Sequence, residues 1–224
     1  MIKPLLKLGI VFLASTTIVQ AQKMFTEVSK QAGINHQFEV FEGFLGGGAC
    51  VIDINNDGLL DIYVCAVAGL LDFKGHNELF INNGDGTFSE KAAAYGLDFK
   101  GYSTQTYFFD YDKDGDLDAY IVNHAVHTNL SHGPASERNN RRPLVGDVLL
   151  QNNEGKFTDV SEKAGIFGGV NGYGLSASIA DFNNDGWDDI YICNDFHEDD
   201  YYYINNKNGT FTEKLSSAFS TISR

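Results

Sequence analysis

The chain has 224 residues and a formal net charge of −14, from 16 Lys and Arg against 30 Asp and Glu. A field of that sign repels nucleic acids and anionic membrane surfaces, so neither is expected as a partner. Three cysteines are too few for a disulfide-built fold, whereas 43% hydrophobic and 13% aromatic residues suffice for a packed core.

The first residues have the pattern of a secretory signal peptide. Lys3 and Lys7 form a basic start, residues 8–19 are mostly apolar, and Val19-Gln20-Ala21 is a small-residue cleavage site. The apolar stretch is too short for a good membrane span. We expect a signal peptide over 1–21, cleavage after Ala21, and a mature domain over 22–224 that is secreted, periplasmic or in the cell envelope. An uncleaved anchor is the alternative.

A nine-residue acidic pattern, D-x-[D/N]-x-D-G-x-x-D, occurs at residues 53–61, 110–118 and 181–189. Short β-branched and aromatic segments flank each copy, which predicts strands on both sides of a tight loop. A second hairpin follows each copy, at residues 79–88, 149–157 and 202–211, with the Asn and Gly residues that tight turns need. Asp85 and Glu154 in these turns are interpreted as turn residues.

A short phrase closes each unit: Phe88-Ser89-Glu90, Phe157-Thr158-Asp159 and Phe211-Thr212-Glu213. The same phrase occurs at Phe25-Thr26-Glu27, which predicts a leading outer strand within residues 24–34. Four strands per unit are typical of a propeller blade. We therefore predict an all-β partial β-propeller of about three blades, over about 43–100, 101–171 and 172–214.

Three units do not close a ring, because propellers usually have four to eight blades. We therefore expect a fragment of a longer protein. The alternatives are a short open array and a ring closed by oligomerisation.

The acidic copies have the oxygen spacing of a calcium loop. Side chains at positions 1, 3, 5 and 9 and the carbonyl at position 7 can supply oxygen ligands, and Gly at position 6 permits the sharp turn. An EF-hand would need Glu at position 12, where Val64, Ile121 and Ile192 stand. An acidic Asx-turn without an ion is the alternative. The predicted calcium ligands are Asp53, Asn55, Asp57, Leu59 and Asp61; Asp110, Asp112, Asp114, Asp116 and Asp118; and Asp181, Asn183, Asp185, Trp187 and Asp189.

The extra length between the second and third copies falls in residues 124–147, which show no strand pattern. His124 and His127 lie in this insertion, and His197 follows the third unit's strand. They could converge on one face and bind a transition metal. The alternative is a set of hydrogen bonds that anchor the loop, to which Arg141, Arg142 and Asp147 would also belong.

These motifs resemble the FG-GAP/VCBS repeat proteins, whose seven-bladed propeller is also found in the integrin α-subunit head. The resemblance covers residues 24–214, although the FG-GAP signature is degenerate at 43–46, 101–103 and 172–174. Residues 123–127, 133–136 and 194–201 are similar to bacterial relatives of cartilage acidic protein, which carry an ASPIC/UnbV domain after the repeats. The chain ends before such a domain. The resemblance implies calcium in the blade hairpins, with Asp53, Asp110 and Asp181 opening the sites.

The sequence contains no G-x-S-x-G, P-loop or dinucleotide-binding pattern, so no catalytic or cofactor-binding residues are predicted. We expect a calcium-binding adhesion scaffold with an extracellular protein or polysaccharide as partner. Residues 124–147 are the first candidate surface. The alternative is an extracellular enzyme that acts on polysaccharide or uses a metal on the loop face.

Overall fold

A computed structural model describes residues 26–36, 47–69, 74–125 and 134–219. The predicted signal peptide lies outside these residues. The described residues are mainly β, with 37% in strands and 10% in helices, and the all-β prediction is confirmed. No helix in the described part of the chain has the length and apolar character needed to cross a membrane.

The described strands form three four-stranded sheets in which sequence neighbours pair antiparallel. This is a partial β-propeller of four-stranded blades. Sheet 1 contains β1 (Ala49–Ile52), β2 (Asp61–Val64), β3 (Glu78–Asn82) and β4 (Phe88–Glu90). Sheet 2 contains β5 (Ser103–Phe109), β6 (Asp118–Asn123), β7 (Val148–Asn153) and β8 (Lys156–Asp159). Sheet 3 contains β9 (Gly174–Ala180), β10 (Asp189–Asn194), β11 (Tyr201–Asn205) and β12 (Phe211–Glu213).

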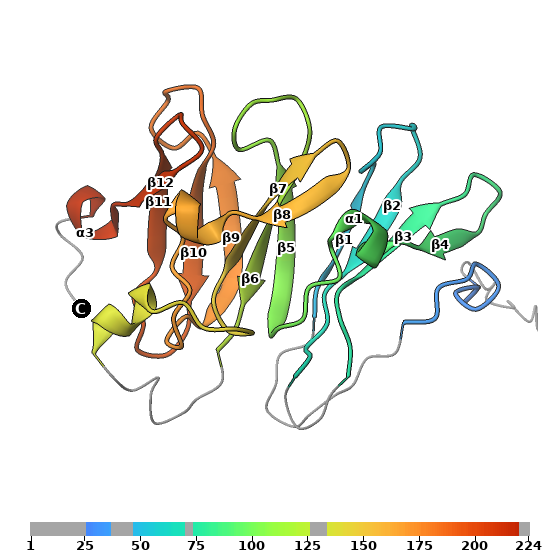
Figure 1. The fold of residues 1–224 in the computed structure, drawn as a ribbon, viewed down its shortest axis with the longest axis horizontal. Coiled ribbons are helices and arrows are strands. Elements are labelled where there is room, and N and C mark those ends of the chain that lie inside the picture. The colour runs from blue at the N-terminus through green and yellow to red at the C-terminus, as the bar shows by residue number, and fades with distance from the viewer. Residues whose placement is uncertain (1–25, 37–46, 70–73, 126–133, 220–224) are drawn as a thin grey trace, which may run out of the picture.

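Short helices follow the last strand of each sheet: α1 (Ala92–Tyr95), α2 (Ser161–Ala164) and α3 (Leu215–Ala218). A 3-10 turn, η1 (Ala135–Asn139), lies in the predicted insertion. The sheets stand side by side, with sheet 1 and sheet 3 at the two ends (Figure 1). The exact extents of the three predicted units remain predictions.

The core lies between the sheets, and β6 shows why its sequence reads as an almost continuous apolar run. Ala119 and Ile121 pack into the cluster shared with sheet 1, whereas Tyr120 and Val122 pack into the cluster shared with sheet 3. Because successive side chains point to opposite faces, a strand between two sheets buries both. All four of these side chains have no exposed surface.

The leading segment differs from its prediction. Residues 26–34 form no strand; they make a turn in which the Ala32 amide donates to the Val28 carbonyl at 2.9 Å. This turn lies against sheet 1, where the Phe88 amide donates to the Ala32 carbonyl at 2.7 Å. A Cβ on Gly33 would lie 2.8 Å from the Phe88 carbonyl oxygen, and a Cβ on Gly96 would lie 2.5 Å from that of Phe157.

The turn therefore takes the place on sheet 1 that α1 takes on sheet 2. The sequence prediction matched the phrase at 25–28 to an outer strand, whereas residues 28–33 follow the helix-and-glycine part of the repeat. Residues 24 and 25 lie outside the described ranges.

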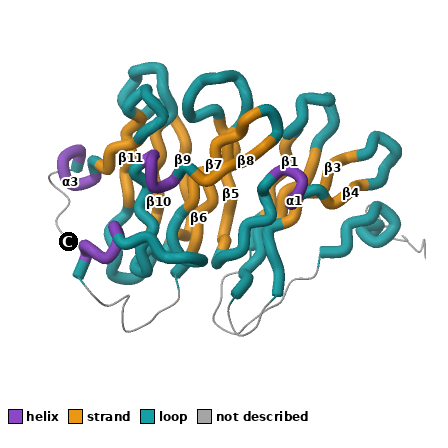
Figure 2. The backbone as a smooth tube through the Cα atoms, in the orientation of Figure 1, coloured by secondary structure: helices purple, strands orange, loops and turns teal. Residues whose placement is uncertain are grey.

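The three acidic loops, β1–β2, β5–β6 and β9–β10, all lie along one edge of the array (Figures 1 and 2). The described part of the insertion lies along the opposite edge (Figure 1). The two regions singled out by the sequence are therefore separate surfaces.

Candidate metal centre

The acidic loops share one backbone path, which explains the invariant glycine of the pattern. Position 4 and position 6 both have positive φ, and a Cβ at position 6 would meet nothing within 4 Å. Glycine is therefore needed for backbone conformation and not for space. The φ values are 56°, 61° and 58° at Asn56, Lys113 and Asn184, and 86°, 101° and 89° at Gly58, Gly115 and Gly186.

The last Asp of each loop is fully buried and accepts a hydrogen bond from a main-chain amide of the third strand of the same sheet. Asp61 accepts a hydrogen bond from the Asn82 amide at 2.8 Å, and Asp118 accepts one from the Asn152 amide at 2.8 Å. Asp189 accepts one from the Asn205 amide at 2.9 Å. These bonds hold each loop against the second hairpin of its blade.

The acidic loops are numbered in chain order: loop 1 is residues 53–61, loop 2 is residues 110–118 and loop 3 is residues 181–189. In loops 1 and 3, main-chain amides of the loop itself donate to both carboxylate oxygens of the first Asp. The two oxygens of Asp53 accept from the Asp57 and Gly58 amides at 3.1 and 2.9 Å. In loop 3 the two oxygens of Asp181 accept from the Asp185 and Gly186 amides at 2.9 and 2.7 Å. This is the Asx-turn arrangement that the sequence left open as an alternative.

Loop 2 is different, because three of its buried oxygens have no donor, whereas loop 3 has one such oxygen, Asp189 Oδ2. Asp110 accepts from the Gly115 amide at 3.1 Å, and Asp112 accepts from the Gln151 side chain at 2.7 Å. The second oxygens of Asp110 and Asp112, and one oxygen of Asp116, are buried without a hydrogen-bond partner. Buried polar atoms normally have partners, so this deficit favours a bound cation.

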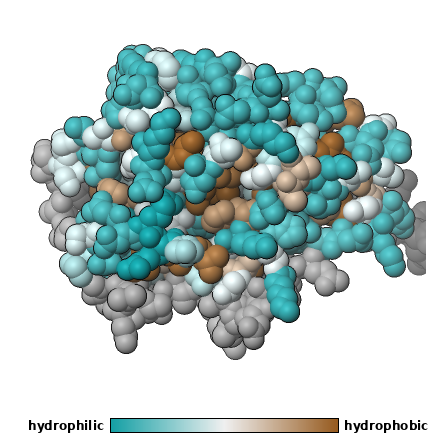
Figure 3. All heavy atoms as spheres, viewed as in Figure 1, coloured by the Kyte–Doolittle hydropathy of each residue, from teal (hydrophilic) through white to brown (hydrophobic). Residues whose placement is uncertain are grey.

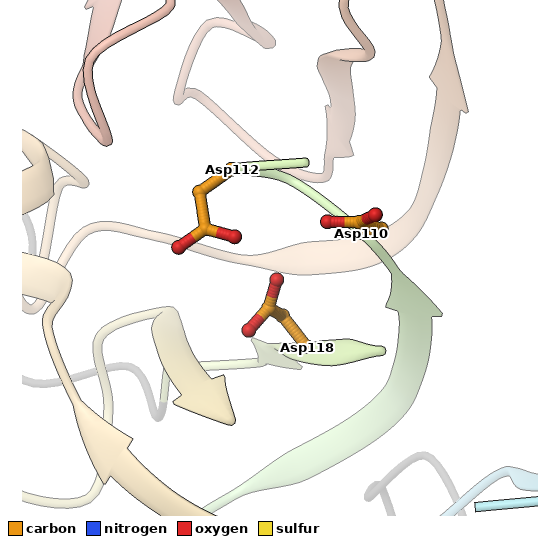
Figure 4. Close-up of side chains that lie close together, drawn as sticks. All are labelled: Asp110, Asp112 and Asp118. Atoms are coloured by element: carbon orange, nitrogen blue, oxygen red, sulfur yellow. The ribbon is translucent and has the colours of Figure 1, made fainter. Parts of the chain in front are cut away.

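Three carboxylates of loop 2 also converge. Asp110, Asp112 and Asp118 each place an oxygen within 4.8 Å of the others, and among the described residues no other three His, Cys, Asp or Glu side chains do so. The Asp112 and Asp118 carboxylates point toward each other, with Asp110 beside them (Figure 4). Asp110 ends the β5 side of the loop and Asp118 begins β6. Figure 3 shows mainly hydrophilic residues along this edge of the molecule.

The electrostatics of loop 2 agree with a cation site. Burial, with a smaller effect from the charges of Asp112 and Asp116, raises the pKa of Asp118 to about 7, although hydrogen bonds from the Asn152 and Tyr111 amides act to lower it. Burial and then the charge of Asp114 raise the pKa of Asp116. Crowded carboxylates disfavour their own ionised forms, and a divalent cation reverses that preference. The oxygen-only donor set fits a hard cation such as calcium.

Two of the predicted histidines pack against the same aromatic ring. His124 at the end of sheet 2 and His197 beyond β10 each lie 5.5 Å, centroid to centroid, from Tyr173. His127 lies outside the described residues. The second metal site therefore stays a prediction.

The described part of the insertion is tied to the neighbouring structure by arginines. Arg141 donates to the Asp147 and Ile166 carbonyls at 3.0 and 2.9 Å. Arg138 pairs with the buried Glu198 at 2.9 Å. The main-chain amide of Arg142 donates to the Gly168 carbonyl at 2.8 Å. These contacts match the loop-anchoring alternative.

One repeated polar feature was missed from the sequence. Asp147 accepts from the Asn123 amide at 2.9 Å and from the Tyr120 hydroxyl at 3.0 Å. Asp200 does the same with the Asn194 amide and the Tyr191 hydroxyl, both at 2.9 Å. The Tyr-x-x-Asn spacing after the second and third acidic loops was the available signal.

Comparisons with known proteins agree with the repeat pattern. The model of the FG-GAP-like repeat family matches residues 53–121, 137–192 and 181–224, which is more than half of the chain. No curated protein matches the chain.

Among solved structures, the chain is similar to an Agrocybe aegerita lectin that recognises non-reducing terminal N-acetylglucosamine. The identity is 18% and the TM-score 0.37, and the similarity covers 74% of this chain and 36% of the lectin chain. The chain therefore spans about a third of that chain's length.

Proposed function

Because this chain belongs to the FG-GAP-like repeat family, a propeller-type binding scaffold, we propose that structural calcium stabilises it outside the cytoplasm. The observation that carries the calcium proposal is the set of buried, donor-free oxygens on Asp110, Asp112 and Asp116. The family resemblance supports the same ion. The nearer likeness to ASPIC/UnbV proteins, and a longer parent protein, belong to this proposal as well.

Asp110, Asp112 and Asp118 would hold the ion in loop 2, which connects β5 to β6. When bound, calcium supplies a compact positive charge that offsets carboxylate repulsion and satisfies the free oxygens. Asp118 already bonds the Asn152 amide, so an ion there would tie the first hairpin of sheet 2 to the second. The role proposed for the ion is structural.

The partner is an extracellular protein or polysaccharide. The candidate surface is the edge with the described insertion, where Arg138 and Arg141 hold the backbone in a fixed place. A pre-ordered loop loses less conformational entropy when it binds. We propose no catalytic role, since the sequence has no nucleophile motif.

The first test compares the thermal unfolding of residues 22–224 with excess calcium and with a chelator. A ligand that binds only the folded state stabilises it by about 2.7 kcal/mol at a hundredfold excess over its Kd. We expect a clear calcium-dependent rise in Tm. Asp110→Ala should remove the part of the rise that loop 2 supplies.

Asp85→Ala is the matched control, because Asp85 is exposed and bonds only to Thr87 in its own turn. This variant should keep the full calcium response. A wild-type Tm that is equal in calcium and in chelator would refute the calcium proposal. A full calcium response in Asp110→Ala would show that loop 2 is not its source.

A further inference from the structure

A single turn position differs in charge between the three blades. In the second hairpin of each blade, an Asn amide donates to the Asp that ends the acidic loop. The residue two positions after this Asn has positive φ. These residues are Gly84, Glu154 and Lys207, with φ of 77°, 53° and 64°. The position is therefore neutral in sheet 1, negative in sheet 2 and positive in sheet 3.

This turn position lies over the acidic loop of its own blade. A Cβ on Gly84 would lie 3.3 Å from the Leu59 side chain in loop 1. In sheet 2, Glu154 lines the same surface pocket as Asp116 of loop 2. In loop 3 the Lys207 ammonium lies 3.2 Å from Asp185 Oδ2 and donates to the Asp185 carbonyl at 3.3 Å.

A second ammonium also reaches loop 3. Lys113, at position 4 of loop 2, donates to the Gly186 carbonyl across the boundary between sheets 2 and 3. Its Nζ lies 5.1 Å from the centroid of the Trp187 ring. Loop 3 thus has two lysine charges, and one of them pairs with Asp185, a predicted calcium ligand. In sheet 2 the residue at the same turn position is acidic instead, and it borders the pocket that contains Asp116.

We propose that the charge at this turn position sets the calcium affinity of each loop, and that Lys207, with Lys113, takes the place of a cation at loop 3. Loop 2 then binds calcium most tightly, loop 1 less tightly and loop 3 least. The inference rests on the proposed calcium binding and assigns it unequally to three loops that the sequence pattern treats alike.

Trp187 is the only tryptophan in the chain, and it lies in loop 3 but also beside Lys113 of loop 2. Loop 3 can therefore be observed by itself in an Asp110→Ala background, in which loop 2 has lost a ligand. Terbium can replace calcium as a probe, and excitation of tryptophan transfers energy only to a nearby terbium ion. We expect weak terbium emission from this background protein. Lys207→Gln should bind terbium at loop 3 at least roughly tenfold more tightly, because a positive charge next to a ligand is removed. Lys100→Gln, at an exposed lysine before β5, is the matched control and should behave as the background protein.

The reverse substitution tests loop 2. Glu154→Lys places a lysine in the turn of sheet 2. The equivalent turn of sheet 3 already has a lysine, Lys207, at a similar φ, so folding should be preserved. Calorimetric titration with calcium should show that this variant has lost the tightest site of the wild-type protein. Circular dichroism of both variants in chelator checks that the fold is intact.

The outcomes separate this inference from the function on which it rests. Wild-type protein that binds no calcium in calorimetry overturns both. Wild-type protein that binds calcium, together with equal tryptophan-sensitised terbium affinity in the Asp110→Ala background with and without Lys207→Gln, overturns only the graded assignment. Retention of the tightest calcium site in Glu154→Lys would also overturn it.

Discussion

Asp118→Ala is expected to lower the free energy of unfolding by about 2–6 kcal/mol, because it leaves two buried main-chain amides without an acceptor. Asp118 has no exposed surface, and its oxygens accept from the Tyr111 amide at 3.1 Å and the Asn152 amide at 2.8 Å. Each unsatisfied buried donor costs about 1–3 kcal/mol. Urea denaturation in chelator measures this loss separately from any loss of calcium.

Asp118→Asn should fall between wild type and Asp118→Ala, because an amide side chain keeps one accepting oxygen and presents an NH2 group to the other donor. Asp85→Ala serves as an Asp-to-Ala control at an exposed turn and should leave the unfolding free energy close to that of the wild type. Equal effects of Asp118→Ala and Asp85→Ala would contradict the structural role of the last loop Asp.

The sheets were predictable because the information that specifies them is local and repeated. Each acidic loop carries its glycine at the position with positive φ, and β-branched and aromatic residues begin directly after it, as at Ile62 and Ile190. Three copies remove the ambiguity that one short apolar run would have. Predicting blades from this pattern required no knowledge of contacts distant in sequence.

The difference between the loops was not predictable in the same way. The pattern treats Asp53, Asp110 and Asp181 as equivalent, whereas the structure satisfies both oxygens of the first and third and only one oxygen of the second. Side chains from the following hairpin, such as Gln151 and Lys207, also contact the loops. Such contacts depend on how two hairpins pack, and spacing within one loop does not encode them.

The insertion shows the same limit. Its lack of a strand pattern was visible, but the attachment of Arg138 to Glu198 joins residues that are far apart in the sequence. Asn171 and Tyr201 donate to the same carboxylate at 2.7 and 2.8 Å. A buried arginine–carboxylate pair of this kind can be recognised only after the two sheets have been placed.

Asp147→Asn is expected to remove a component of the pH dependence of stability. Asp147 is 5% exposed, and burial raises the pKa of its carboxyl to about 7 from an ordinary value of 3.8. Hydrogen bonds from the Asn123 amide and Tyr120, and the charge of Arg141, act in the opposite direction and are weaker.

The direction of this pH dependence follows from proton binding to Asp147 in the folded and unfolded states. Between about pH 4 and pH 7 the folded protein holds a proton on Asp147 that the unfolded chain has lost, so the stability from this group falls as pH rises. Above about pH 7 both states are ionised and the contribution is gone. From about pH 5 to about pH 8 the loss is about 2–3 kcal/mol.

Asparagine has a similar shape and cannot titrate, so the difference in unfolding free energy between wild type and Asp147→Asn should change by that amount across the window. Urea denaturation in chelator at several pH values measures it, and taking the difference cancels carboxyls common to both proteins. Asp85→Asn is the control, because hydrogen bonds from Thr87 lower the pKa of Asp85 and place its titration below the window. Parallel pH profiles for wild type and Asp147→Asn would mean that the buried carboxyl is ionised throughout, with Arg141 and its hydrogen bonds outweighing its burial.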